Sequence, residues 1–158
     1  DMAKSRGLGD VYKRQTKGHE FLKRAAPART PEWRDELLKN TIAALEHPDL
    51  DGLFTDKAMA EVPLSGLIGD RVVMGQVDRL LIEQNKILFI DYKTNRQTPE
   101  TLAEIPKNYL RQMAAYMAVL ERIYPNYEVK GALLWTQSMK SHVLSRAFLA
   151  DYMPGTSR

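Results

Sequence analysis

The chain of 158 residues is 44% hydrophobic and 27% charged, which is the length and balance of one globular domain with its own core. It contains no cysteine, so disulfides, thiolate zinc sites and iron–sulfur clusters are excluded. The net charge of +3 equals that of residues 1–18, because the rest of the chain holds as many acidic as basic side chains. Charge by itself therefore indicates no partner.

No apolar run approaches the roughly 18 residues that a membrane-spanning helix needs, so we expect a cytoplasmic protein without a membrane partner. Residues 1–18 lack a sustained apolar period, and we interpret them as a non-native or disordered tail. The predicted domain covers residues 19–153, and residues 154–158 form a second, short tail.

The first predicted helix begins at Thr30, whose hydroxyl suits an N-cap, with Pro31 at the first helical position. It ends before His47-Pro48 and is followed by a loop. Apolar residues recur through it at helical spacing, namely Trp33, Leu37, Leu38, Ile42 and Leu45. The pattern predicts a helix that packs on the core.

The stretch 61–93 contains three apolar runs separated by Gly69-Asp70 and Gln84-Asn85. Two-residue turns at these places predict a three-strand antiparallel meander. The last run, residues 87–90, is continuously apolar, as expected of a strand covered on both faces.

Turns of two residues set the expected pairing of the meander, with Glu61 opposite Asp78 and Asp78 opposite Asp91. Lys93 shares their face because side chains alternate with a period of two. Like charges directly opposite one another destabilise a sheet, and a bound divalent cation is the best reason for such a row. A longer turn or a bulge would move one carboxylate to the other face.

Residues 106–124 predict a second long helix with two stripes. The core stripe is Leu110, Met113, Met117 and Leu120, and the polar–aromatic stripe beside it is Tyr109, Gln112 and Tyr116. Residues 129–135 predict another buried strand, followed by a loop and a short ending. This order of elements indicates an α/β sandwich built on one mixed sheet flanked by helices.

The row of carboxylates offers oxygen ligands, which suit Mg²⁺, with Mn²⁺ as the alternative, better than a soft metal. Such a cation polarises a phosphoryl oxygen and activates water, while Lys93 beside Asp91 would offset charge on the phosphorus in the transition state. We infer a site for phosphodiester hydrolysis. The alternative for each residue taken singly is a solvated charge at the end of a strand.

Three segments, GQVDRL, FIDYKTNR and YLRQMAAY, resemble the RecB-like branch of the PD-(D/E)XK nuclease superfamily. They are most similar to the C-terminal nuclease domain of AddA-type helicase–nuclease subunits, and the likeness runs from residue 61 to residue 135. The resemblance implies a restriction-endonuclease-like sandwich. It also implies a Mg²⁺-dependent DNA exonuclease module that acts in double-strand break repair and recombination.

By this resemblance Asp78 and Asp91 bind the metal, although Val77 stands where the superfamily name has proline. Lys93 resembles the lysine of the D/E-x-K motif, the Tyr92 carbonyl is a further ligand candidate, and Glu61 is similar to the acid of the first strand. The resemblance assigns the lining of the active site or the DNA path to three residues, Tyr109, Gln112 and Tyr116.

Members of this branch carry a metal-binding histidine on an early helix, and His19, His47 and His142 do not match its context. We therefore expect an N-terminally truncated nuclease domain, separated here from its histidine helix and from an upstream helicase domain. An AddB-type subunit is the implied partner besides DNA. The chain has no Walker motif, so ATP hydrolysis is not expected of it.

Two other functions are compatible with the same residues. The first is a catalytically incomplete nuclease fold that serves as a DNA-binding or subunit-docking scaffold. The second is an RNA-directed module in which Tyr109 and Tyr116 stack on bases.

Overall fold

The computed structural model describes the backbone of residues 2–155 and the side chains of residues 13–155. In chain order its elements are α1 (Met2–Ala25), α2 (Pro31–Leu45), the 3₁₀ turn η1 (Pro48–Leu50), β1 (Met59–Ile68), β2 (Arg71–Glu83), β3 (Lys86–Lys93), η2 (Leu102–Glu104), α3 (Lys107–Ile123), β4 (Glu128–Trp135), β5 (Lys140–Leu144) and η3 (Ala150–Tyr152). Within the described residues, no helix combines the length and apolar character needed to cross a bilayer.

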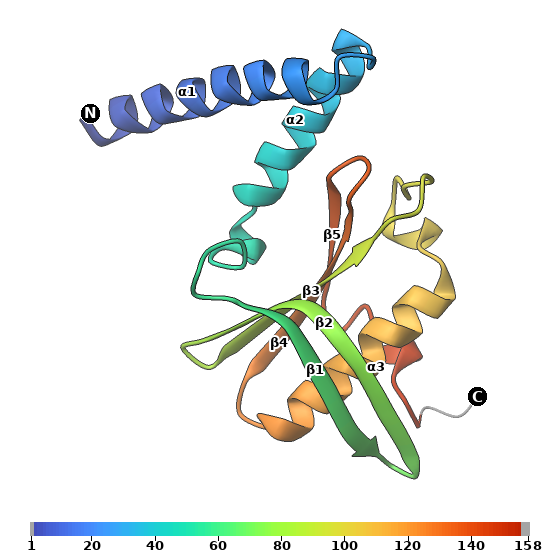
Figure 1. Cartoon of the computed structure of the whole chain (residues 1–158). Helices are drawn as coiled ribbons and strands as arrows, with labels where there is room; N and C mark the ends of the chain where they lie inside the picture. Colours follow the sequence, from blue (N-terminus) through green and yellow to red (C-terminus); the bar gives the residue numbers. More distant parts are fainter. Residues whose placement is uncertain (1, 156–158) are drawn as a thin grey trace.

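The five strands form one sheet in the order β1-β2-β3-β4-β5. Only β3 and β4 are parallel, because α3 carries the chain back across the sheet between them, and the other neighbours are antiparallel. Figure 1 shows α3 lying along one face of this strongly twisted sheet. The predicted mixed α/β sandwich is confirmed.

Each face of the sheet covers its own apolar core. Under α3, Met113 and Met117 meet Val77 and Phe89. On the other face, residues after α2 meet inner-strand side chains, in a cluster that includes Leu50, Leu53, Leu81, Ile90 and Leu134. Adjacent Phe89 and Ile90 are both fully buried, on opposite faces, so β3 is covered on both sides as its apolar run predicts.

Both two-residue turns of the meander are confirmed. Ile68 pairs with Arg71 across the first turn, and Glu83 pairs with Lys86 across the second. Gln84 and Asn85 both have positive φ, 47° and 62°, as a type I′ turn requires. The register predicted for the two hairpins is therefore the observed one.

The predicted helix after Thr30 is also confirmed as α2. The Thr30 hydroxyl accepts a hydrogen bond of 3.2 Å from the Trp33 amide, and Pro31 occupies the first turn. The helix ends at Leu45, and His47 then caps η1 by accepting a bond from the Asp49 amide.

The structure has a continuous helix, α1, from Met2 to Ala25, where the sequence predicts a non-native or disordered tail over residues 1–18. The described part of this stretch is therefore helical rather than disordered. Figure 1 shows α1 crossing α2 away from the sheet. Its described links to α2 are polar and exposed, His19 to Asp35 at 3.3 Å and Arg14 to Glu46 at 3.8 Å. The described side chains of α1 are mostly exposed, and such a helix needs no apolar stripe. The periodicity of apolar residues in the sequence therefore does not reveal it. Residues 156–158, most of the second predicted tail, lie outside the described residues.

The sequence predicts a loop and a short ending after residue 135, but residues 140–144 form a fifth strand, which contains His142. Residues 140–144 pair antiparallel with β4. They are only five residues long and mostly half-buried, and so short a segment has no clear alternation.

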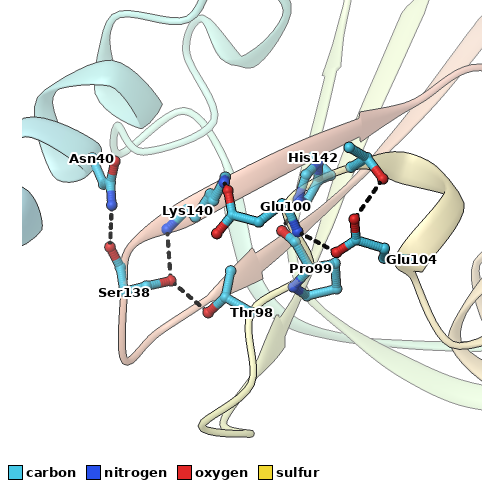
Figure 2. Close-up of polar contacts among 9 residues, drawn as sticks. Asn40, Thr98, Pro99, Glu100, Glu104, Ser138, Lys140 and His142 are labelled. Atoms are coloured by element: carbon cyan, nitrogen blue, oxygen red, sulfur yellow. Dashed lines mark hydrogen bonds and ion pairs between the residues drawn. The ribbon is translucent and has the colours of Figure 1, made fainter.

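The β4–β5 hairpin fastens the segment between β3 and α3 (Figure 2). The Ser138 hydroxyl lies 2.8 Å from that of Thr98, and the His142 Nε2 lies 2.9 Å from the Pro99 carbonyl oxygen. Lys140 forms an ion pair with Glu100. The hairpin is itself tied to α2, since Asn40 donates to the Ser138 carbonyl at 2.9 Å. These contacts position the start of α3 beside the end of β3.

Candidate active site

The last residues of β3 place two opposite charges inside the protein. Asp91 and Lys93 are only 8% and 9% exposed. Being two residues apart on a strand, they point to the same face, the one that α3 covers. The Lys93 Nζ lies 2.5 Å from the Asp91 Oδ2. Buried charges are retained only where partners compensate them, so this pair is a candidate functional feature.

The partners of Lys93 come from the polar–aromatic stripe of α3. Its Nζ donates to the Gln112 Oε1 at 2.7 Å and lies 4.1 Å from the centre of the Tyr109 ring. The Gln112 Nε2 in turn donates to the Tyr116 hydroxyl at 3.1 Å. The structure thus brings together Lys93 and all three stripe residues, in one connected chain of contacts.

Asn95 extends this chain and was not singled out from the sequence. Its amide nitrogen donates to the Tyr109 hydroxyl at 2.6 Å, and that hydroxyl donates back to the Asn95 Oδ1 at 3.0 Å. The reciprocal bonds hold the Tyr109 ring against Lys93. The sequence signal was weak, namely an amide two residues after Lys93 at the exit of a buried strand.

Asp78 lies next to this group, with its carboxylate turned into the backbone of β3. Its Oδ2 accepts a bond of 2.6 Å from the Tyr92 amide. The neighbouring pair Arg79 and Ile90 keeps the predicted register, which places Asp78 opposite Asp91 although the two form no ladder pair. The Tyr92 side chain packs into the core on the other face, where burial raises the pKa of its phenol.

The pKa of Asp91 is raised above its ordinary value of 3.8. Burial is the largest cause, because it disfavours the charged form. The hydrogen bond and the charge of Lys93 oppose this shift, and the negative charge of Asp78 adds to it. The two aspartates are therefore close enough to feel each other, as the predicted row requires.

Glu61 is not brought into contact with the other three residues. It is exposed and has a positive φ of 52°. The pairs on either side of it, Ala60 with Arg79 and Val62 with Val77, keep the register, but Glu61 and Asp78 leave the ladder between them. Val77 and Leu80 both lie in the core under α3, which strict alternation forbids, so the pleat is locally broken here.

The three histidines have other roles in the structure. His19 faces Asp35, His47 caps η1, and His142 contacts the Pro99 carbonyl. Among residues 13–155, whose side chains are described, no three histidine, aspartate or glutamate side chains form a cluster that could hold a metal ion.

The residues present still fit a magnesium ion. Each of Asp78 and Asp91 has one carboxylate oxygen engaged with the protein, and the other makes no hydrogen bond to the described part of the chain. Mg²⁺ is commonly bound by one or two carboxylates while it keeps several waters. Two adjacent carboxylates with free oxygens meet that requirement without a third side chain.

Comparison with known proteins identifies the class to which this fold and site belong. The profile of the PD-(D/E)XK nuclease superfamily matches residues 4–151, and the chain belongs to that superfamily. Membership implies a nuclease, and these nucleases generally use divalent metal ions. The superfamily-level resemblance seen in the sequence is confirmed.

No curated protein matches the chain significantly. Among solved structures, the chain is similar to one described as the crystal structure of SSO0001, at 18% identity and a TM-score of 0.40. That match covers 88% of this chain and 67% of the other. A similarity of this size supports no statement about function.

Proposed function

We propose that this domain hydrolyses DNA phosphodiester bonds with the help of Mg²⁺, or Mn²⁺ in its place. The observation that carries the proposal is the buried ammonium of Lys93, fixed by Asp91 and Gln112 beside a second aspartate. A hydrophobic residue would stabilise this interior at least as well, so a buried charge cluster needs another reason. A buried lysine beside two aspartates at the end of a strand suits chemistry on a phosphate.

Asp78 and Asp91 would hold the metal, with the Tyr92 carbonyl oxygen as a further ligand. When bound, the ion would polarise a phosphoryl oxygen and lower the pKa of a coordinated water. Keeping it requires both carboxylates in their charged form, so the raised pKa of Asp91 works against binding at acidic pH.

Lys93 would keep its proton and donate hydrogen bonds from Nζ. In the resting protein those bonds go to Asp91 and Gln112. With a phosphodiester present, the third ammonium hydrogen would point to a phosphate oxygen or to the attacking water, where it offsets the charge that grows during attack. The Gln112 amide and the Tyr109 ring limit the directions that Nζ can take.

Glu61 enters the proposal as a supporting acid, since the register places it across from Asp78. Tyr109 would line the path of the DNA, while the buried Tyr116 would hold the Gln112 amide in place. Because Glu61 is exposed and without a contact to the other site residues, Glu61→Gln should slow cutting far less than Asp78→Asn does.

The test is the cutting of end-labelled linear DNA in Mg²⁺ by the wild type, Asp91→Asn and Lys93→Met. We expect both variants to lose at least about a hundredfold in rate, the scale of one lost electrostatic contact to a transition state. Asp70→Asn, a turn residue with no contact to the site, is the matched control and should cut normally. Equal cutting by all four proteins would refute the assignment. An RNA strand of the same sequence tests whether the substrate is DNA.

We further propose that the domain works as the exonuclease module of a cytoplasmic helicase–nuclease in double-strand break repair. Its support is the similarity of GQVDRL, FIDYKTNR and YLRQMAAY to AddA-type subunits. An upstream helicase domain and an AddB-type subunit are the partners this role requires. Co-elution with an AddB-type subunit in size-exclusion chromatography tests it, and elution at unchanged volumes would count against it.

A scaffold that has lost catalysis is the second candidate. It is favoured by the lack of a third metal-ligating side chain near Asp78 and Asp91 within the described residues. Titration with Mg²⁺ separates the two functions, because an ion that binds the folded state stabilises it by about 2.7 kcal/mol at a hundred times its Kd. A scaffold should show neither this rise in Tm nor any cutting.

A further inference from the structure

A basic groove lies beside the site residues of α3. Its volume is about 640 Å³, and it is bounded by the start of β2, one side of α3 and the segment after η3. Figure 1 shows these three parts of the fold next to one another. Three cations line the groove, Arg71, Lys107 and Arg111, against one acid, Asp151.

The side chains of these three cations are exposed and, within the described residues, make no hydrogen bond or ion pair. Several other basic residues of the sheet and its loops are paired, as Lys57 is with Glu83 and Lys130 with Asp49. Lys107 and Arg111 are also four residues apart on α3, where like charges repel each other. An anionic partner from outside the chain would remove that repulsion.

The groove and the candidate site share the helix α3. Arg111 directly precedes Gln112, the partner of Lys93, and Ala115 of the groove directly precedes Tyr116. From Lys107 to Ala115 the helix advances about 12 Å. One strand of a duplex advances about 3.4 Å per nucleotide, so the groove spans about three to four nucleotides.

We propose that this groove binds the sugar–phosphate backbone of DNA next to the bond that is cut. The inference rests on the proposed nuclease function and names the surface that holds its substrate. Arginine and lysine contacts to phosphates position a nucleic acid without reading its sequence. The groove therefore holds any sequence, and it sets affinity rather than the rate of the chemical step.

The experiment compares two full-length variants with the same loss of charge. The groove variant is Arg71→Gln, Lys107→Gln and Arg111→Gln, and the control variant is Lys23→Gln, Lys39→Gln and Lys86→Gln, at three exposed cations elsewhere. Binding of labelled single-stranded and duplex oligonucleotides is measured by fluorescence anisotropy in EDTA, where no cutting occurs, over a series of salt concentrations.

We expect the groove variant to bind at least about tenfold more weakly than the control variant. Each lost phosphate contact lowers the magnitude of the slope of log K against log salt by about 0.9 for duplex DNA and about 0.7 for single strands. Loss of three contacts should therefore lower that magnitude by about 3 for duplex DNA and about 2 for single strands. In Mg²⁺ the KM for DNA should rise while kcat stays close to that of the wild type.

Equal affinities of the two variants for DNA would refute the proposal that the groove binds DNA. The nuclease function would still stand if the wild type cuts DNA. Binding of labelled polyglutamate, a stand-in for an acidic protein, is measured in the same way. If the groove variant loses polyglutamate binding but keeps DNA binding, the groove binds an acidic protein and the proposal is refuted. A wild type that binds through the groove but never cuts would support the groove and refute the nuclease function. Circular dichroism of each variant checks that these exposed substitutions leave the fold unchanged.

Discussion

Lys93 and Asp91 are held by their contact with each other and by the stripe on α3, while the negative charge of Asp78 across the sheet disfavours the charged form of Asp91. Burial makes the charge of Asp91 costly, and only part of that cost is offset by Lys93. The cost should be visible in the stability of the metal-free protein and in its dependence on pH.

The raised pKa of Asp91 predicts how stability changes with pH in EDTA. The folded protein holds this proton more tightly than the unfolded chain, so the group stabilises the fold below about its ordinary value of 3.8. That contribution is lost as pH rises through the higher folded value. We therefore compare the free energies of unfolding of the wild type and Asp91→Asn. The wild-type value minus the variant value should fall as pH rises above 3.8. Urea unfolding of both proteins over this range measures the difference, and a rise would contradict the prediction.

Gly75 leaves the space that the Tyr116 side chain occupies. A Cβ at this position would lie 2.2 Å from the Tyr116 hydroxyl oxygen, closer than any real contact. Gly75→Ala should displace Tyr116 from Gln112, lower stability by about 1–3 kcal/mol, and reduce cutting.

Gly66→Ala is the matched control, since it also faces α3 but would meet Val119 at 3.2 Å, where a small shift suffices. Unfolding by urea and cutting rates are compared for both variants. If both substitutions change stability and cutting rate equally, the position of Tyr116 does not depend on a glycine at residue 75.

At the scale of elements, the site is made by a strand end and a helix that are brought together by β5. The β4–β5 hairpin holds residues 98–100, and these residues precede α3 (Figure 2). The geometry around Lys93 should therefore depend on contacts that do not touch it.

Thr98→Val tests this dependence, because it removes the bond to the Ser138 hydroxyl and keeps the shape of the side chain. We expect a loss of about 1 kcal/mol and faster amide hydrogen exchange in residues 94–104. Thr101→Val is the control, since Thr101 bonds only Glu104 within the same segment. If exchange rises equally in both variants, the hairpin does not hold this segment.

At the scale of the whole molecule, the sheet with α3 and the cores on its two faces is separate from α1. Among the described side chains of α1, residues 13–25, none belongs to either core cluster, and the contacts described for the helix run to α2. The site residues belong to the sheet and α3, apart from Asn95 just after β3.

Removal of residues 1–25 should therefore leave the domain folded, with a Tm close to that of the full chain and an unchanged cutting rate. Calorimetry and the DNA-cutting assay measure the two properties. A collapse of the thermal transition would show that α1 stabilises the domain through α2 and that residues 1–18 are an integral part of it.

The turns, the capped helix after Thr30 and the strand with Asp91 and Lys93 were predictable, because their signals are local. Positive φ at Gln84 and Asn85, a hydroxyl at an N-cap and an apolar run act within a few residues. The sequence predicted the polar–aromatic stripe on α3 but not its contact with Lys93. The spacing of residues on a helix does not say which strand the helix covers.

The sequence by itself determined the register of both hairpins, the faces of α3 and the positions of the acids along the chain. Tertiary structure decided which acids meet. Period-two alternation assumes an unbroken pleat, and the pleat breaks where Glu61 takes a positive φ and Asp78 turns to the Tyr92 amide. Asp78 and Asp91 stay together across that break because the ladder beyond them holds the register, while Glu61 remains exposed on β1.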